Sequence, residues 1–260
     1  KQCPGTEIIA EESTAWAGVT SPVSMNGLGF LFKWNMGWMN DFLEYMKLDP
    51  YFRANNHGKL TFSMQYAYSE NFIQVLSHDE VVHGKCSMIE KMPGEYEDKF
   101  ANLRTAYGFM YGHPGKKLLF MGQEFAQFRE WSEKRSLDWE LLDYDMHQKM
   151  QAYVRELNKL YEKYDAMYVN DCEPIGFEWM SCDNADMSTV SFVRRGSSAK
   201  NQLLFVCNFT PVSYEKYRTG VPCAGDYVKV LSSDDEKFGG TGANIKKTIK
   251  AEKIECEGKD

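Results

Sequence analysis

The most constraining feature of the sequence is a stretch in which an apolar run turns abruptly polar. Residues 72–76 read Phe-Ile-Gln-Val-Leu, and residues 77–80 continue as Ser-His-Asp-Glu. Such a run predicts a buried parallel strand that delivers charged groups at its carboxyl end. In a (β/α) barrel that end of the strands carries the active site. The candidate residues at this edge are His78, Asp79, Glu80 and His83.

An earlier stretch has the same pattern of an apolar run followed by charged residues. Residues 7–10 form a mostly apolar run that leads directly into Glu11 and Glu12. Two strands that end in carboxylates, with helical material between them, predict that Glu11 and Asp79 face one cleft. Glycoside chemistry needs such paired carboxylates: one acts as general acid and base, and another supports the positive charge of the transition state.

The composition narrows the function further. A net charge of -7 gives the chain no attraction to nucleic acid or to an anionic membrane. No apolar run in the sequence is long enough to span a bilayer. The seven cysteines are odd in number and scattered, without a Cys-x-x-Cys pair, which favours a reduced cytoplasmic protein.

The first two thirds of the chain alternate between strand and helix patterns. Strands are predicted near residues 8, 31, 73 and 118, and apolar stripes with helical spacing lie at 39–46, 100–110 and 146–164. Residues 51–70 lack a regular period, and we expect a loop there. A complete (β/α)8 barrel needs roughly 250 residues. Four strands in about 165 residues therefore predict half a barrel.

The pattern changes near Asp165. Beyond it, apolar residues alternate within short runs that turn residues separate, which is typical of an antiparallel β domain. The predicted domains are the barrel portion, residues 1–168, and an all-β domain, residues 169–260. Within the latter, residues 246–260 are polar and are expected to fray or to form one edge strand.

Several motifs together resemble the α-amylase superfamily and, within it, its glucan-branching family. The motifs lie at residues 9–14, 27–39, 76–85, 119–127 with 130–131, and 176–179, in the order that the family has them. The resemblance implies that residues 1–168 are strands 5 to 8 of a (β/α)8 TIM barrel. It also implies that an antiparallel β-sandwich domain follows.

The resemblance also implies a chemistry. In a retaining mechanism, Glu11 would protonate the leaving glucan, Asp79 would stabilise the distorted sugar, and His78 would bind it. A 6-hydroxyl of a second glucan would then replace water as the acceptor, which makes an α-1,6 branch in an α-1,4-glucan. The resemblance implies no metal and no organic cofactor.

Two motifs of the family are absent from the sequence. The nucleophile motif, Gly-x-Arg-x-Asp-Ala, and the motif Asp-x-x-x-Asn-His should lie upstream of Lys1, and the family's closing apolar strand is not found before Asp260. We therefore expect a C-terminal piece, truncated at its end and inactive alone. Half a barrel exposes strand edges, and we expect these edges to favour self-association.

Other residues have both a site interpretation and a structural one. The residues that we assign to substrate binding besides His78 are Glu12, Glu80, His83, Lys85 and Trp131, and each could instead serve loop structure or packing. Two rival functions also stay open. One is another hydrolase of the superfamily, and the other is a glucan-binding fragment without catalysis, which the absent nucleophile favours.

Overall fold

A computed structural model of the chain describes residues 5–242 and 246–254. Its first part contains a four-stranded sheet of parallel strands in sequence order. The strands are β1 (Ile9–Ala10), β2 (Phe32–Trp34), β3 (Phe72–Leu76) and β4 (Lys116–Leu119). All four lie where the apolar runs predict them. All five residues of β3 are buried, which confirms the buried parallel strand.

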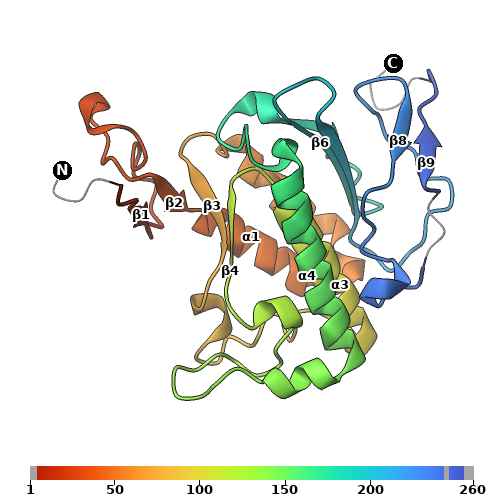
Figure 1. Cartoon of the computed structure of the whole chain (residues 1–260), viewed down its shortest axis with the longest axis horizontal. Helices are drawn as coiled ribbons and strands as arrows, with labels where there is room; N and C mark the ends of the chain where they lie inside the picture. Colours follow the sequence, from red (N-terminus) through yellow and green to blue (C-terminus); the bar gives the residue numbers. More distant parts are fainter. Residues whose placement is uncertain (1–4, 243–245, 255–260) are drawn as a thin grey trace.

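Three long helices accompany the sheet: α1 (Met36–Lys47), α3 (Tyr96–Gly112) and α4 (Asp145–Lys163). α1 begins at Asn35, whose side chain accepts a hydrogen bond from the backbone N–H of Trp38. α3 begins with a reciprocal capping box between Glu95 and Asp98. All three predicted helical stripes are confirmed. In Figure 1 the helices lie between the parallel strands and the antiparallel strands of the C-terminal part.

Residues 51–70 differ from the expected loop. They contain α2 (Gly58–Thr61) and consecutive short 3-10 turns. Tertiary contacts of buried side chains fix these turns: Arg53 donates to the carbonyl of Phe209 at 2.6 Å, and a ring nitrogen of His57 donates to the carbonyl of Cys182 at 3.1 Å. Partners more than a hundred residues away leave no local periodicity, so the expectation of a loop was wrong.

The C-terminal part contains antiparallel strands, as predicted. The first three form one sheet in the order β5-β6-β7: β5 (Phe177–Ser181), β6 (Thr189–Arg195) and β7 (Gln202–Asn208). β8 (Asp226–Val228) pairs with β9 (Thr248–Lys250), so the tail contributes the expected edge strand. Its last residues, 255–260, lie outside the described residues. Within the described ranges, no helix is long and apolar enough to cross a membrane.

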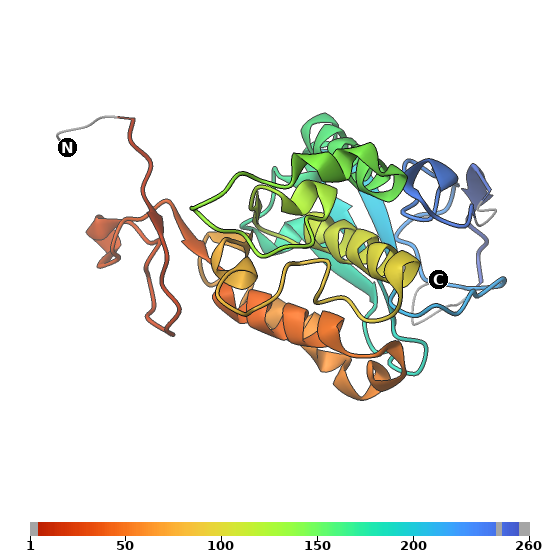
Figure 2. The ribbon, with the colours of Figure 1, turned by 90° about the horizontal axis from the view of Figure 1, so that it is seen from below.

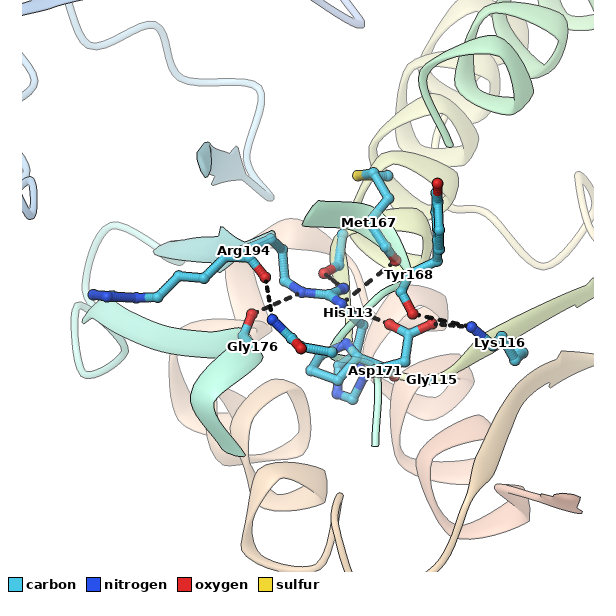
Figure 3. Close-up of polar contacts among 12 residues, drawn as sticks. His113, Gly115, Lys116, Met167, Tyr168, Asp171, Gly176 and Arg194 are labelled. Carbon is cyan, nitrogen blue, oxygen red and sulfur yellow. Dashed lines mark hydrogen bonds and ion pairs between the residues drawn. The ribbon is translucent and has the colours of Figure 1, made fainter. Parts of the chain in front are cut away.

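A buried ion cluster joins the two parts (Figure 3). Arg194 of β6 donates to the Asp171 carboxylate at 2.6 Å, and their side chains are only 0% and 1% exposed. Lys116 of β4 contacts the same carboxylate at 3.1 Å. Arg194 also donates to the carbonyl of Gly112 at 2.9 Å, at the C-terminal end of α3 where helical carbonyls lack internal partners. Arg194 therefore fastens the C-terminal sheet to the end of α3, and Asp171 links it to β4 through Lys116.

β1 and the following segment, residues 11–31, form an arm that projects from the body (Figures 1 and 2). Glu70, 7% exposed, fixes this arm at its root. Its carboxylate accepts the backbone N–H groups of Val19 at 2.8 Å and Thr20 at 2.7 Å, and also the Thr20 hydroxyl. Burial raises the pKa of Glu70, but the hydrogen bonds from Thr20 and Val19 lower it below its ordinary value.

Glu70→Gln is expected to loosen the arm without unfolding the body. The amide keeps one acceptor oxygen but turns its NH2 group towards N–H donors, which leaves a backbone donor unpaired at a cost of about 1–3 kcal/mol. Limited chymotrypsin digestion should then cut faster at Trp16 and Leu28, both exposed in the arm. Glu7→Gln, at an exposed position before β1, is the control. Equal cleavage rates for both variants would contradict the anchoring role.

Candidate active site

The carboxyl ends of β3 and β4 are held together by backbone contacts. The N–H of Phe120, the residue after β4, donates to the carbonyl of Leu76 at 3.0 Å. The Gln123 side-chain amide reaches the carbonyls of Leu76 and Ser77, each at 3.3 Å. The sequence predicts the catalytic groups at this edge of the sheet, and in the structure the edge is continuous and held by hydrogen bonds.

The predicted pair His78 and Asp79 lies at this edge, directly after β3. The strand ends at Leu76, and a short turn over Asp79–Val81 carries the chain away. His78 Nε2 lies 3.2 Å from Asp79 Oδ1, and each side chain is 44% exposed. The backbone N–H of Asp79 donates to the Ser77 hydroxyl at 3.2 Å, which fixes the start of the turn. A partly exposed imidazole–carboxylate pair can bind sugar hydroxyls and stabilise a developing positive charge.

Trp131 meets this pair from the loop after β4. Its ring centroid lies 6.3 Å from that of His78 and 5.2 Å from that of Phe120, in edge-on geometry in both cases. The backbone N–H of Trp131 donates to the carbonyl of Val81 at 2.9 Å, so the loop is fixed to the turn that contains Asp79. Of the site residues predicted from sequence, Trp131, His78 and Asp79 are thus brought together.

Glu80 contacts the backbone at the start of the turn. Only 7% of Glu80 is exposed, and its carboxylate accepts the backbone N–H of Ser77. The structure thus gives Glu80 a role in closing the turn, and its contact with substrate stays a prediction. His83 and Lys85 follow on an exposed loop, where their side chains are accessible.

Glu11 and Glu12 lie on the arm. Glu11 is exposed directly after β1. Glu12 pairs with Lys33 at 2.6 Å and accepts the N–H of Thr14 at 2.6 Å. These hydrogen bonds, the one from Lys33 foremost, lower the pKa of Glu12 to about 2, so it stays ionised. The structure therefore gives Glu12 a partner in β2, while its contact with substrate stays a prediction.

The register separates Glu11 from Asp79 along the sheet. Ala10 pairs with Lys33, and Lys33 pairs with Phe72, the first residue of β3. Asp79 lies beyond the other end of β3. Both carboxylates follow the carboxyl ends of parallel strands, as expected. Along the strand direction, however, Asp79 lies beyond Glu11 by more than the length of β3. Their convergence on one cleft remains a prediction.

Two side chains near the site, Glu130 and Lys91, were not singled out from sequence. Glu130 accepts the backbone N–H groups of Gly84 and Cys86 at 2.9 and 2.6 Å. Lys91 Nζ donates to the carbonyls of Lys85 and Cys86. Glu130 belongs to the motif at 130–131, but its contacts join segments 44 and 46 residues apart, which the sequence does not reveal. Lys91 bonds to residues only five and six positions away, and no motif marked it.

Comparisons with known proteins agree with the motifs. Residues 179–259 match the alpha amylase C-terminal all-beta domain. A 1,4-alpha-glucan branching enzyme of Butyrivibrio fibrisolvens is 56% identical over 99% of this chain and 40% of its own length. One from Halothermothrix orenii is 56% identical over 92% of this chain and 38% of its own length. The chain thus spans about two fifths of the relatives it matches.

Solved structures share the fold at low identity. A type I pullulanase of Bacillus subtilis has a TM-score of 0.62 and 14% identity over 95% of this chain and 38% of its own. A pullulanase of Paenibacillus barengoltzii has a TM-score of 0.58 and 16% identity over 87% and 40%. The resemblance inferred from the motifs is thus confirmed: over nearly its whole length the chain is similar to part of the 1,4-alpha-glucan branching enzymes, with the all-beta domain of the alpha amylases at 179–259.

Proposed function

We propose that the chain supplies the acid/base and stabilising half of a 1,4-α-glucan branching enzyme. The observation that carries the proposal is the His78–Asp79 pair beside Trp131 at the end of a buried parallel strand, in a chain 56% identical to branching enzymes. Four parallel strands with helices between them fit strands 5 to 8 of a (β/α)8 barrel in residues 1–168. Residues 169–260 would then be the β-sandwich domain.

The proposed reaction is a retaining transfer. A carboxylate outside these residues attacks the anomeric carbon of an α-1,4-glucan, while Glu11 gives its proton to the glycosidic oxygen. The resulting glycosyl ester is then attacked at the same carbon by the 6-hydroxyl of a second glucan, whose proton returns to Glu11. Asp79 stabilises the positive charge on the ring, and His78 orients the sugar. The remaining wall of the substrate site is formed by Glu12, Glu80, His83, Lys85 and Trp131.

Further features of the chain fit this proposal. The net charge of -7 suits a neutral glucan ligand better than a polyanion. None of the five described cysteines is in a disulfide, which fits a reducing cytoplasm. β1 and β4 are the edges of the described parallel sheet, and Ile8 and Ile9 at one edge are 59% and 46% exposed. Such edges favour pairing with the remaining half of the barrel or with a second copy.

The test joins these residues to the N-terminal part of the Butyrivibrio fibrisolvens relative and incubates the chimera with amylose. A branching enzyme shifts the iodine stain without releasing reducing ends, and we expect this result. A hydrolase of the superfamily releases reducing ends, and a binding fragment changes neither signal. Either of the latter outcomes would overturn the proposal.

A further inference from the structure

The loop that follows the His78–Asp79 turn has an unfavourable backbone. His83, Gly84 and Cys86 all have positive φ angles, 54°, 80° and 66°. Glycine adopts this region freely, but a non-glycine residue is strained there. Such strain persists only where surrounding contacts determine the conformation, so contacts that fix residues 83–86 must compensate for it.

A clamp of two charged side chains makes these contacts. On one side, the two oxygens of Glu130 each accept one backbone N–H, from Gly84 and from Cys86. These hydrogen bonds lower the pKa of Glu130, which therefore stays a carboxylate. On the other side, Lys91 donates to the backbone carbonyls of Lys85 and Cys86. Two donors and two acceptors of the loop backbone are thus taken up by opposite charges.

Lys91 is buried against the loop and contacts its backbone carbonyls. It is only 8% exposed, and burial lowers its pKa to about 8. Its ammonium hydrogens point at backbone carbonyls, which are the partners a buried cation needs when it stays charged. Burying an ammonium group costs free energy, and the hydrogen bonds to the loop carbonyls offset that cost only while the loop keeps this conformation.

We propose that Glu130 and Lys91 are positioning residues that preset the 83–86 loop for contact with an α-glucan. The clamp uses the loop backbone and leaves the side chains of His83 and Lys85 exposed, one turn beyond Asp79. Glu130 directly precedes Trp131, so one short segment both holds the loop and carries the aromatic ring beside His78. A loop held in its binding conformation loses less entropy when the ligand binds. This inference rests on the proposed function.

The experiment compares Glu130→Gln with Glu133→Gln in the 260-residue chain. Glu133 is an exposed carboxylate three residues away in the same loop, so both variants remove the same charge. We expect Glu130→Gln to speed hydrogen–deuterium exchange in the 82–88 segment and to weaken maltoheptaose binding about tenfold by calorimetry, since one charged hydrogen bond is lost. Glu133→Gln should change neither.

A second variant separates positioning from folding. His83→Ala with Lys85→Ala leaves the clamp intact, and we expect weaker maltoheptaose binding with unchanged exchange in the 82–88 segment. It also serves if Glu130→Gln fails to fold. Faster exchange with unchanged affinity in Glu130→Gln, or full affinity in the double variant, would overturn the inference alone. If the unsubstituted chain does not bind maltoheptaose, the inference is overturned, and branching by the chimera still decides the proposed function.

Discussion

Asp171→Ala is expected to destabilise the chain by about 3–5 kcal/mol, because it leaves a buried charge without its partner. The Arg194 guanidinium would lose the carboxylate 2.6 Å away while remaining 0% exposed. Lys116 and Tyr161 also contact that carboxylate, at 3.1 and 3.3 Å. Urea unfolding followed by circular dichroism measures the loss.

Glu156→Ala is the matched control. Glu156 pairs with Lys159 on the exposed face of α4, with side chains 35% and 61% exposed. Exposed pairs contribute about 0.2–1 kcal/mol, so the control should lose no more than that. If Asp171→Ala also cost less than about 1 kcal/mol, the cluster would not lock the two parts together.

The same cluster predicts a dependence on pH. Burial raises the pKa of Asp171, but Lys117, Arg194 and Lys116 lower it below its ordinary value. A lowered folded-state pKa means that the carboxylate contributes stability above its unfolded pKa of about 3.9 and loses it as the pH falls through the folded value. The stability difference between the parent and Asp171→Ala should therefore shrink in acid.

The sequence predicts much of the fold because its strongest patterns are local. The apolar run at 72–76 followed by polar residues identifies a buried strand, and β3 is buried at every position. The helical stripe at 146–164 needs only one face against the core, and α4 follows it within a residue at each end. Element type follows from such periodicity without knowledge of any partner.

Local patterns fail where a distant partner determines the structure. The turns at 50–65 depend on Arg53, whose partner is the carbonyl of Phe209, 156 residues away. The parallel register cannot be read from alternation in β1, which is two residues long. The sequence therefore predicts that Glu11 follows a strand end, but not its offset along the sheet from Asp79.

The candidate site divides in the same way. Residue types that belong to glycoside chemistry, such as His78 and Asp79, stand out because polar groups end an apolar strand. Side chains that hold the backbone around them have no such signal. Glu130 lies in the motif at 130–131, but the motif does not show its role, which depends on contacts with residues 44 and 46 positions away.

The polypeptide of residues 1–260 is expected to form no α-1,6 links from amylose when it is tested alone. Retaining transfer needs a nucleophile roughly 5–5.5 Å from the acid/base. Glu12 is a poor substitute, because it neighbours Glu11, adjacent residues of an extended chain point to opposite faces, and its carboxylate is paired with Lys33. Asp79 is assigned to stabilisation, and the sequence lacks the nucleophile motif of the family. Debranching of the product followed by chain-length analysis detects such links.

In the chimera that supplies the remaining part, Glu11→Gln should lower the branching rate about 10²–10⁴-fold, the usual share of general acid/base catalysis. Glu7→Gln, at the other end of β1, changes the same charge and should leave the rate unchanged. An amide cannot donate a proton to the leaving glucan. Added azide should therefore restore cleavage by the Glu11→Gln variant only for glucosides whose leaving group departs without being protonated. Branching by residues 1–260 alone, abolished by Glu11→Gln, would instead mean that the nucleophile lies within this chain.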